Sequence, residues 1–382
     1  MSRRVQKLTD PSHESVDSDI VKDAHIARQY LVAAELEGLL PTSILQRSLS
    51  TKSVVSTTSS FATKFHSLRH LDDAQDYREI GAGLQGVVYE RLGSANVAKK
   101  ERSTNRGRPL RDEFGMHQKV SDAFLKYKEY SSDVRVPRPY DFIAKESVSP
   151  ELLSRMPADD QKPSDIATME RILPLPKVVR KALIKQFYAE DDSLSDENLV
   201  TQLLNERANK HCLVRVYLGR RRVAVPKESF TLRNFPLTID MMGRLGLDMM
   251  QFATMIGSAY AIMHWAANIT GDDTEFVLGT STTSNNDFQQ RSVHLYLIDF
   301  GQCEVVDMKE DQDVIFQAFK GSMVLQQNQI YLPHPKRTVT LYQAWKAAYL
   351  NTSRRVIHHE GLLFDPEEFL VEYEEYLEDF DP

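Results

Sequence analysis

The chain has 382 residues, of which 41% are hydrophobic and 26% are charged, enough apolar material for one large core or two smaller ones. This composition excludes a fibrous or wholly disordered protein. The net charge of −7 argues against a uniformly basic nucleic-acid binder, and ten acids lie between Glu360 and the C-terminus, where there is no Lys or Arg.

Two features of the chain bear on its cellular compartment. Cys212 and Cys303 are the only cysteines, which are too few for a disulfide framework. The first ten residues are polar and lack the apolar core of a secretory signal. We therefore expect a cytoplasmic protein.

Residues 1–70 are expected to form an extension outside the compact body. Apolar residues recur at helical spacing over residues 19–36, with Gly38 after them, and predict one helix. Eleven of the nineteen residues from Thr42 to Ser60 are Ser or Thr and none is acidic, which is typical of a linker. A simple spacer is the favoured role, and a phosphorylated segment is the alternative.

From Tyr77 the pattern predicts a strand, a glycine turn and two further strands. The glycines of this G-x-G-x-x-G pattern are Gly81, Gly83 and Gly86. A β-branched strand follows them directly, as in kinases, whereas a dinucleotide-binding site would need a helix there. The alanine-x-lysine spacing predicts that Lys100 lies beneath the loop and pairs with Glu113, in a helix expected over residues 110–120. A plain β-hairpin is the alternative.

The middle of the chain predicts a crossing between two lobes. Residues 137–143 and 168–172 are typical of strands, and Pro174 and Pro176 stiffen the segment that follows. Beyond it we expect a basic helix over residues 177–187, a surface turn and capped helix from residue 190, and a strand pair formed by residues 211–217 and 222–225 that turns at Gly219.

Two groups of basic residues are candidates for contact with RNA. They are Arg215, Arg220, Arg221, Arg222 and Lys227, and Arg171, Lys177, Arg180, Lys181 and Lys185. Such groups are commonly solvated faces, and RNA contact is the sharper alternative, which would show as salt-sensitive binding. The candidate RNA-binding residues are Arg220, Arg221, Arg222 and Lys181.

Two helices are expected in the second half of the chain. Residues 249–271 carry no formal charge, but the polar residues among them, together with Arg244 and Asp248, favour a buried helix over a membrane span. Asp365 and Pro366 predict the start of a C-terminal helix that packs on the body. We expect no membrane partner.

Four motifs follow one another in order. They are His264-Trp265, residues 273–279 (D-T-E-F-V-L-G), residues 299–303 (D-F-G-Q-C) and residues 328–335 (N-Q-I-Y-L-P-H-P). Together they resemble a fungal family long known only as a domain of unknown function, over roughly residues 75–375. That family is similar to protein kinases and aminoglycoside phosphotransferases. It includes the arginine-containing cyclodipeptide synthases of fungal secondary metabolism, which join amino acids from aminoacyl-tRNAs into a diketopiperazine.

The resemblance implies an α+β, protein-kinase-like two-lobe fold. The small β-rich lobe would span residues 71–176, and the larger, mostly helical lobe would span residues 177–382 with the acidic C-terminal helix. The resemblance also implies two aminoacyl-tRNA partners, one of them arginyl-tRNA. No motif identifies the second amino acid or the oligomeric state.

Part of the kinase machinery is missing. A strand that ends in Asp299-Phe300-Gly301 is where kinase-like folds hold Mg²⁺ against nucleotide phosphates. A kinase also needs a base five residues before the second metal ligand, and if Glu275 is that ligand, the base position is Thr270, which cannot accept the proton. An ATP- and Mg²⁺-dependent phosphotransferase or a nucleotide-binding pseudokinase remains the alternative function, and a non-enzymatic interaction module is the third.

Cyclodipeptide formation makes different demands. It requires a group that takes a proton from the attacking amine, stabilisation of the oxyanion, and a carboxylate for the guanidinium of arginine. The candidate catalytic residues are Asp299, Glu275, Asp273 and His264; for His264 the favoured reading is a buried helix end, and a base beside the acidic loop is the alternative. The candidate substrate-binding residues are Asp272, Gln302, Gly81, Gly83, Gly86, Lys100 and Glu113. Cys303 is either an acceptor of an aminoacyl group or a small buried residue. No metal site and no cofactor is expected, because the ester is already activated.

Overall fold

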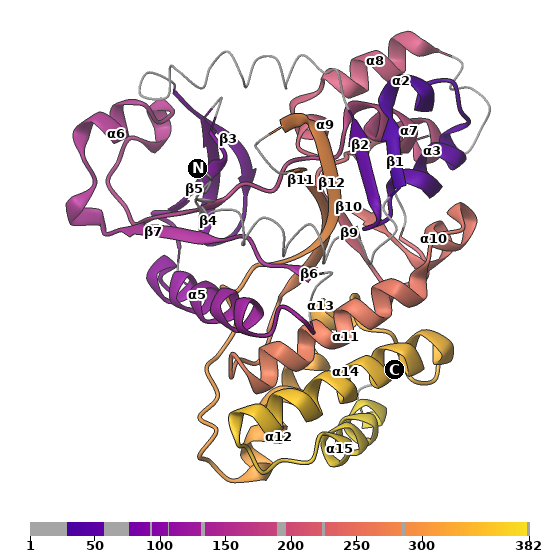
Figure 1. Cartoon of the computed structure of the whole chain (residues 1–382). Helices are drawn as coiled ribbons and strands as arrows, with labels where there is room; N and C mark the ends of the chain where they lie inside the picture. The colour runs from indigo at the N-terminus through magenta and orange to yellow at the C-terminus, as the bar shows by residue number, and fades with distance from the viewer. Residues whose placement is uncertain are drawn as a thin grey trace, which may run out of the picture.

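The computed structural model describes residues 29–56, 76–91, 94–105, 107–130, 134–188, 196–223, 226–283 and 287–379. In this part of the chain, two β-sheets lie side by side and a group of helices gathers below them (Figure 1). The structure is therefore mixed α+β, as the sequence predicts.

The smaller sheet has five antiparallel strands in the order β3-β4-β5-β8-β7. Its strands are β3 (Tyr77–Ala82), β4 (Gly86–Arg91), β5 (Asn96–Glu101), β7 (Pro139–Ile143) and β8 (Ile166–Glu170). Helix α5 (Leu110–Lys126) packs on the β7 and β8 side through Phe114, which clusters with Ala167 and Phe142. A short helix α6 (Pro150–Ser154) lies in the connection from β7 to β8. The strands predicted around the glycine turn and the helix after them are confirmed.

The larger sheet has seven strands collected from distant parts of the chain. Its order is β1-β2-β12-β11-β9-β10, and β6 also pairs with β12. The strands are β1 (Gln29–Val32), β2 (Ser53–Ser56), β6 (Val134–Arg135), β9 (Val214–Val216), β10 (Phe235–Leu237), β11 (Glu275–Thr283) and β12 (Asp287–Ile298). The long β11–β12 hairpin is its centre, and its register places Glu275 opposite Ile298.

Part of the segment predicted as a linker belongs to this sheet. Residues 41–48 form helix α3 (Pro41–Ser48), and β2 pairs with β12. Leu45 and Val55 are fully buried, so the compact body does not begin near residue 70. The linker prediction was wrong here because pairing with a strand far along the chain leaves no mark on local composition.

The predicted helix over residues 19–36 is also wrong for the described residues. Residues 29–32 form β1, and only α2 (Ala33–Leu36) is helical. The remainder of that prediction, the end of the linker at residues 57–60 and the start of the turn predicted from residue 190 lie outside the described residues.

Most of the described helices lie after residue 176. They are α7 (Lys177–Phe187), α8 (Glu197–Asn205), α9 (Arg207–Lys210), α10 (Ile239–Leu245), α11 (Met249–Trp265), α12 (Gln312–Met323), α13 (Gln326–Gln329), α14 (Val339–Glu360) and α15 (Pro366–Asp379). The basic helix and the capped helix after it are confirmed. The strand pair turning at Gly219 is not, because β9 pairs in parallel with β10, and residues 222–223 lie in no strand.

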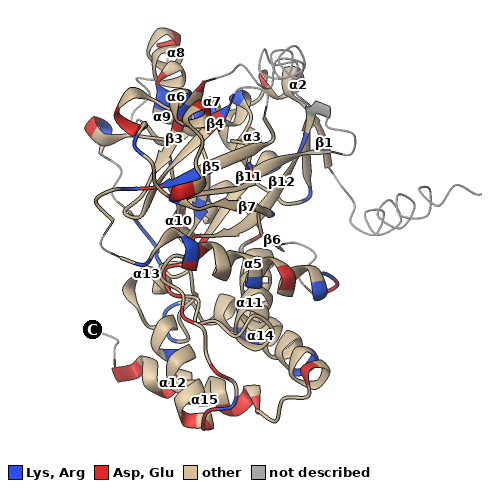
Figure 2. Ribbon diagram, turned by 90° about the vertical axis from the view of Figure 1, so that its left-hand side faces the viewer, with Lys and Arg blue, Asp and Glu red and all other residues tan. Residues whose placement is uncertain are grey.

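The C-terminal helix docks on the body through both its apolar and its acidic side chains. Phe369 and Leu370 are fully buried. The acids of α15, red in Figure 2, meet basic residues of α12 and α14: Lys320 pairs with Glu372, Lys346 with Glu374 and Arg354 with Glu367. The expected packing of this helix is confirmed.

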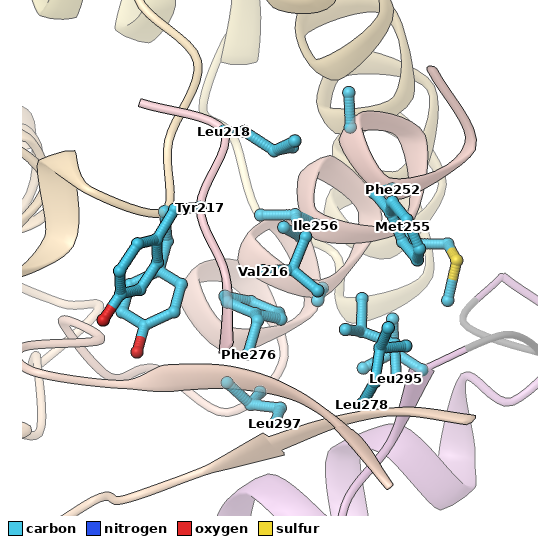
Figure 3. Packing of buried hydrophobic residues seen from close by; sticks show 14 of the residues in the cluster. Val216, Tyr217, Leu218, Phe252, Met255, Ile256, Phe276, Leu278, Leu295 and Leu297 are labelled. Atoms are coloured by element: carbon cyan, nitrogen blue, oxygen red, sulfur yellow. The ribbon is translucent and has the colours of Figure 1, made fainter. Parts of the chain in front are cut away.

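Helix α11 is the buried helix that the sequence predicts. Figure 3 shows Phe252, Met255 and Ile256 facing the side chains of the sheet. The partners that they face are Val216 of β9, Phe276 and Leu278 of β11, and Leu295 and Leu297 of β12. Each such side chain contributes about 1.5–3 kcal/mol on burial, so α11 anchors the hairpin whose ends carry the candidate site. No helix in the described ranges is long and apolar enough to span a bilayer.

Candidate functional site

Three carboxylates gather where β11 begins and β12 ends. Glu275 opens β11, Asp299 directly follows β12, and the hairpin register brings these two ends together. Asp273, in the turn before β11, and Asp299 both have left-handed backbone conformations, with φ of 56° and 67°. Aspartate tolerates this region better than most residues. We call Asp273, Glu275 and Asp299 the acidic site.

The carboxylates of the acidic site are close enough to affect one another's ionisation. Burial raises the pKa of Glu275 to about 7; Arg215 opposes the shift, and the charges of Asp299 and Asp273 add to it. Burial also raises the pKa of Asp273, and Asp299 is the next largest cause. The side chain of Asp299 itself is exposed. A carboxylate that titrates near neutral pH is suited to take up and release a proton.

Arg215 is part of this site, although the sequence placed it in a basic surface group. It lies on β9, the neighbour of β11, and its guanidinium pairs with Glu275. The two side chains are only 25% and 15% exposed. Glu275 is thus the carboxylate of the acidic site that pairs with Arg215.

Asp272 lies beside the acidic site but makes different contacts. Its carboxylate accepts a hydrogen bond from the Thr270 hydroxyl, which in turn accepts one from the Glu304 backbone N–H at 3.0 Å. Burial raises the pKa of Asp272, and the Thr270 hydrogen bond opposes that shift. Thr270, at the position where a kinase would have its base, is thus a structural residue of the turn.

Asn328, in the last of the four motifs, holds the same turn in place. Its buried amide donates hydrogen bonds to the carbonyl oxygens of Gly271, at 3.0 Å, and Ser322, at 2.9 Å. Tyr331, three residues on, is buried near Arg215, and burial raises the pKa of its hydroxyl group, which stays neutral. The fourth motif, residues 328–335, therefore helps to position the second motif, residues 273–279. The spacing of the motifs in the sequence does not reveal this link.

The predicted pair of Lys100 and Glu113 is wrong by one residue. Lys99 forms the ion pair with Glu113, at 2.5 Å, and both side chains are largely buried. Lys100 lies on the other face of β5, where its ammonium group donates to the Lys162 carbonyl at 2.8 Å and to the Ser164 hydroxyl at 2.7 Å. Successive side chains of a strand point to opposite faces, so only one of two adjacent lysines can face α5.

The Lys99–Glu113 pair lies near Asp299. Burial raises the pKa of Glu113, Lys99 opposes this shift, and the charge of Asp299 adds to it. The strand lysine, the helix glutamate and the aspartate after β12 are thus within electrostatic reach of one another, which joins the small sheet to the acidic site.

The glycine loop folds back onto the turn after Asp299. The Gly83 N–H donates to the Gly86 carbonyl at 2.9 Å, and the buried Gln85 amide donates to the Gly301 carbonyl at 3.1 Å. A Cβ at Gly301 would lie 2.0 Å from the Gln85 side-chain oxygen, so this contact requires glycine. Gln85 is a residue at the site that the sequence did not single out.

His264 does not belong to the site. It is fully buried, its ring stacks on Phe319 with centroids 4.2 Å apart, and Nδ1 lies 2.9 Å from the Tyr349 hydroxyl. Burial lowers its pKa to about 3. The expectation that it acts as a base is wrong, because a helix that is apolar on every side carries even its polar residues into the core.

The two remaining candidates of the third motif have different surroundings. Cys303 is fully buried, and burial raises the pKa of its thiol well above the usual value, which favours the structural role. Gln302 is exposed. Gly81 lies away from this turn, on β3, where it lines a separate pocket.

The candidate RNA-binding residues do not form one free basic surface. Arg220 and Arg221 are exposed, whereas Arg222 pairs with Asp240 at 2.6 Å. Lys181 pairs with Glu197, as does Lys185. Lys181 and Lys185 share one carboxylate, so part of their charge is offset, and the exposed Arg220 and Arg221 remain better placed to contact an anionic partner.

Within the described ranges, no group of three or more His, Cys, Asp or Glu side chains is arranged to hold a metal ion. A comparison with models of protein families gives no match, and no curated protein matches the chain. The geometry of the acidic site and the order of the four motifs are the features that bear on function.

Proposed function

We propose that the protein is a tRNA-dependent cyclodipeptide synthase, an aminoacyltransferase that takes arginine from arginyl-tRNA and a second amino acid from another aminoacyl-tRNA. The observation that carries this proposal is the acidic site: a carboxylate with a pKa of about 7, Glu275, lies beside two carboxylates, Asp273 and Asp299. Two anionic side chains suit a guanidinium, and one that titrates near neutrality suits proton transfer.

In this proposal the residues of the acidic site have separate roles in binding and proton transfer. Asp299 and Asp273 bind the arginyl guanidinium. Glu275 takes the proton that the amine loses as it attacks the ester carbon of the other aminoacyl group, and Arg215 limits how far its pKa rises. The C–N bond forms, the ester C–O bond breaks, and the proton passes to the departing ribose oxygen. A second attack of the same kind closes the ring, so neither ATP nor a metal is consumed.

A protein-kinase-like arrangement of two lobes is part of the proposal. It is supported by the five-stranded antiparallel sheet, by the ion pair between Lys99 of that sheet and Glu113 of α5, and by their proximity to Asp299. Protein kinases pair a strand lysine with a helix glutamate near a metal-binding aspartate in this way. Thr270 at the base position argues against phosphoryl transfer, so we place the synthase first.

The test is to incubate the protein with arginyl-tRNA and a mixture of other aminoacyl-tRNAs, without ATP, and to identify the products by mass spectrometry. We expect an arginine-containing cyclic dipeptide whose yield falls by at least about tenfold in Asp299→Asn. Arg354→Gln, in a surface pair of α14, should match the wild type. Absence of any cyclic dipeptide with every pairing would refute the proposal.

Nucleotide binding without synthase activity is the second candidate, and the Lys99–Glu113–Asp299 arrangement favours it. Titration with Mg-ATP tests it. A pseudokinase should lose affinity in Lys99→Met and keep it in Lys100→Met, because only Lys99 is directed towards Glu113 and Asp299. Equal effects of the two substitutions would count against it.

A further inference from the structure

A second pocket, of about 160 Å³, lies between the β3–β4 hairpin and the segment that follows β8. Its walls combine apolar side chains with basic ones. The lining includes Ile80, Val88, Ile172 and Leu213 on the apolar side and Arg171, His211 and Arg233 on the basic side. No lining residue carries a carboxylate. We call this the basic pocket.

Basic side chains from several parts of the chain act on His211, which lines the pocket. Burial lowers the pKa of His211 to about 4, and Arg171, Arg233, Arg207 and Arg180 lower it further by repulsion. Arg171 is 6% exposed and pairs with Glu90. The lining itself holds no carboxylate, so positive charge lies in a poorly solvated place, and a bound anion would offset that cost.

Arg291, on β12, adds a further positive charge near Arg171. It is buried, and its pKa is lowered to about 10 by burial and then by repulsion from Arg171 and Arg180. Several of these guanidinium groups already donate to main-chain oxygens, as Arg180 does to Leu175 and Asn209 and Arg207 to Glu79.

Arg233 lines the pocket, and its Nε is buried without a hydrogen-bond partner among the described residues. An unpaired buried donor is destabilising, and an oxygen of a ligand would offset that cost. His211, on the same wall, is neutral at physiological pH and offers one further N–H or lone pair.

We propose that the basic pocket binds a small phosphate ester. The phosphate accepts hydrogen bonds from Arg233 and lies in the positive field of Arg171, and the organic part packs against Ile80, Val88 and Leu213. A phosphate has three strong acceptor oxygens and is the group that clustered arginines recognise best. This site is separate from the acidic site and does not depend on the synthase reaction.

The test is calorimetric titration of the intact protein with AMP, adenosine and inorganic phosphate, without any aminoacyl-tRNA. We expect AMP to bind at least about tenfold more tightly than adenosine, and Arg233→Gln to lose at least about tenfold in AMP affinity. Arg233→Lys should keep part of the affinity. Arg354→Gln, which removes a surface arginine from α14, is the matched control and should bind AMP as the wild type does.

Three results would overturn the proposal: equal affinity for AMP and adenosine, unchanged AMP affinity in Arg233→Gln, or no saturable binding of either phosphate compound at millimolar concentration. Thermal unfolding of each variant, followed by circular dichroism, checks that the fold is retained. Where Arg233→Gln proves unstable, the AMP–adenosine comparison in the wild type decides the question.

Discussion

The acidic site and the basic pocket both adjoin one face of β11, yet they carry opposite charges. On β11, Glu275 and Gly279 point to one face, and Gly279 packs against Ile172 at the basic pocket. Four residues of strand separate the two positions by roughly 13 Å. The other face of β11, which includes Phe276 and Leu278, is fully buried in the core against α11.

The two regions manage their charge differently. In the acidic site Arg215 pairs with Glu275, yet the pKa of Glu275 is still raised to about 7. In the basic pocket Arg171 pairs with Glu90, and burial and neighbouring arginines drive His211 to the neutral form. In both places a group gives up its charge because like charges and burial outweigh the available partner. A substrate cation at one and an anion at the other would relieve this.

The largest expected effect comes from removing the cation of the acidic site. Arg215→Met leaves Glu275 partly buried without its partner and should lower the free energy of unfolding by about 3 kcal/mol at pH 8. At pH 5 Glu275 is protonated, so the loss should be smaller. Urea unfolding at both pH values measures it. The double variant Arg215→Met/Glu275→Gln should recover most of the loss; additive losses would show that the pair is unimportant.

The next largest loss of stability is expected from Asn328, which holds the turn before β11 in place. Asn328→Ala removes two hydrogen bonds from a fully buried amide and should cost about 2–3 kcal/mol. Gln329→Ala is the control, because its half-buried amide donates a single bond to Val324, and it should cost about 1 kcal/mol or less. Urea unfolding of the two variants would contradict this account if they lost the same stability.

Local pattern was sufficient to predict much of the framework. The glycine hairpin, α5, α7, the buried α11 and the docked α15 all have a periodicity or a cap within their own residues. The acidic site was predictable in part, because Asp273, Glu275 and Asp299 adjoin apolar strands whose pairing brings them together.

What the sequence did not predict depends on distant contacts. The segment 53–56 becomes a strand only through β12. Which of Lys99 and Lys100 faces Glu113 depends on the phase of the strand, and no motif spacing fixes that phase. Arg215 lies in an apparently basic surface group until the parallel β9–β10 pair and β11 place it beside Glu275. The basic pocket combines arginines from several separate elements, so its charge cannot be located from any one of them.

A smaller effect should appear in the pH dependence of stability. The pKa of Glu275 is raised in the folded state to about 7 from an ordinary value of 4.5, so the folded protein binds its proton more tightly than the unfolded chain does. The stability contributed by this proton is fully present below about pH 4.5 and is lost as the pH rises through 7. The slope is at most about 1.4 kcal/mol per pH unit.

Glu275→Gln should remove that slope. The measurement is the difference in unfolding free energy between wild type and variant from pH 4.5 to pH 8, which cancels the contributions of Asp272, Asp273 and Glu113. A difference that does not vary with pH over this window would mean that Glu275 has an ordinary pKa, and the proton-transfer role would lose its support.

The smallest expected effects are pKa shifts, which test whether neighbouring like charges act on Glu275 and His211 in the same way. Asp299→Asn removes a negative charge beside Glu275 and should lower the pKa of Glu275, whereas Arg233→Gln removes a positive charge beside His211 and should raise the pKa of His211, each by about one unit. NMR titration of the carboxyl carbon and the imidazole protons follows both. Shifts of the opposite sign, or none, would show that burial alone sets these pKa values. Neither region would then carry the excess charge that makes it a site for an ion of the opposite sign.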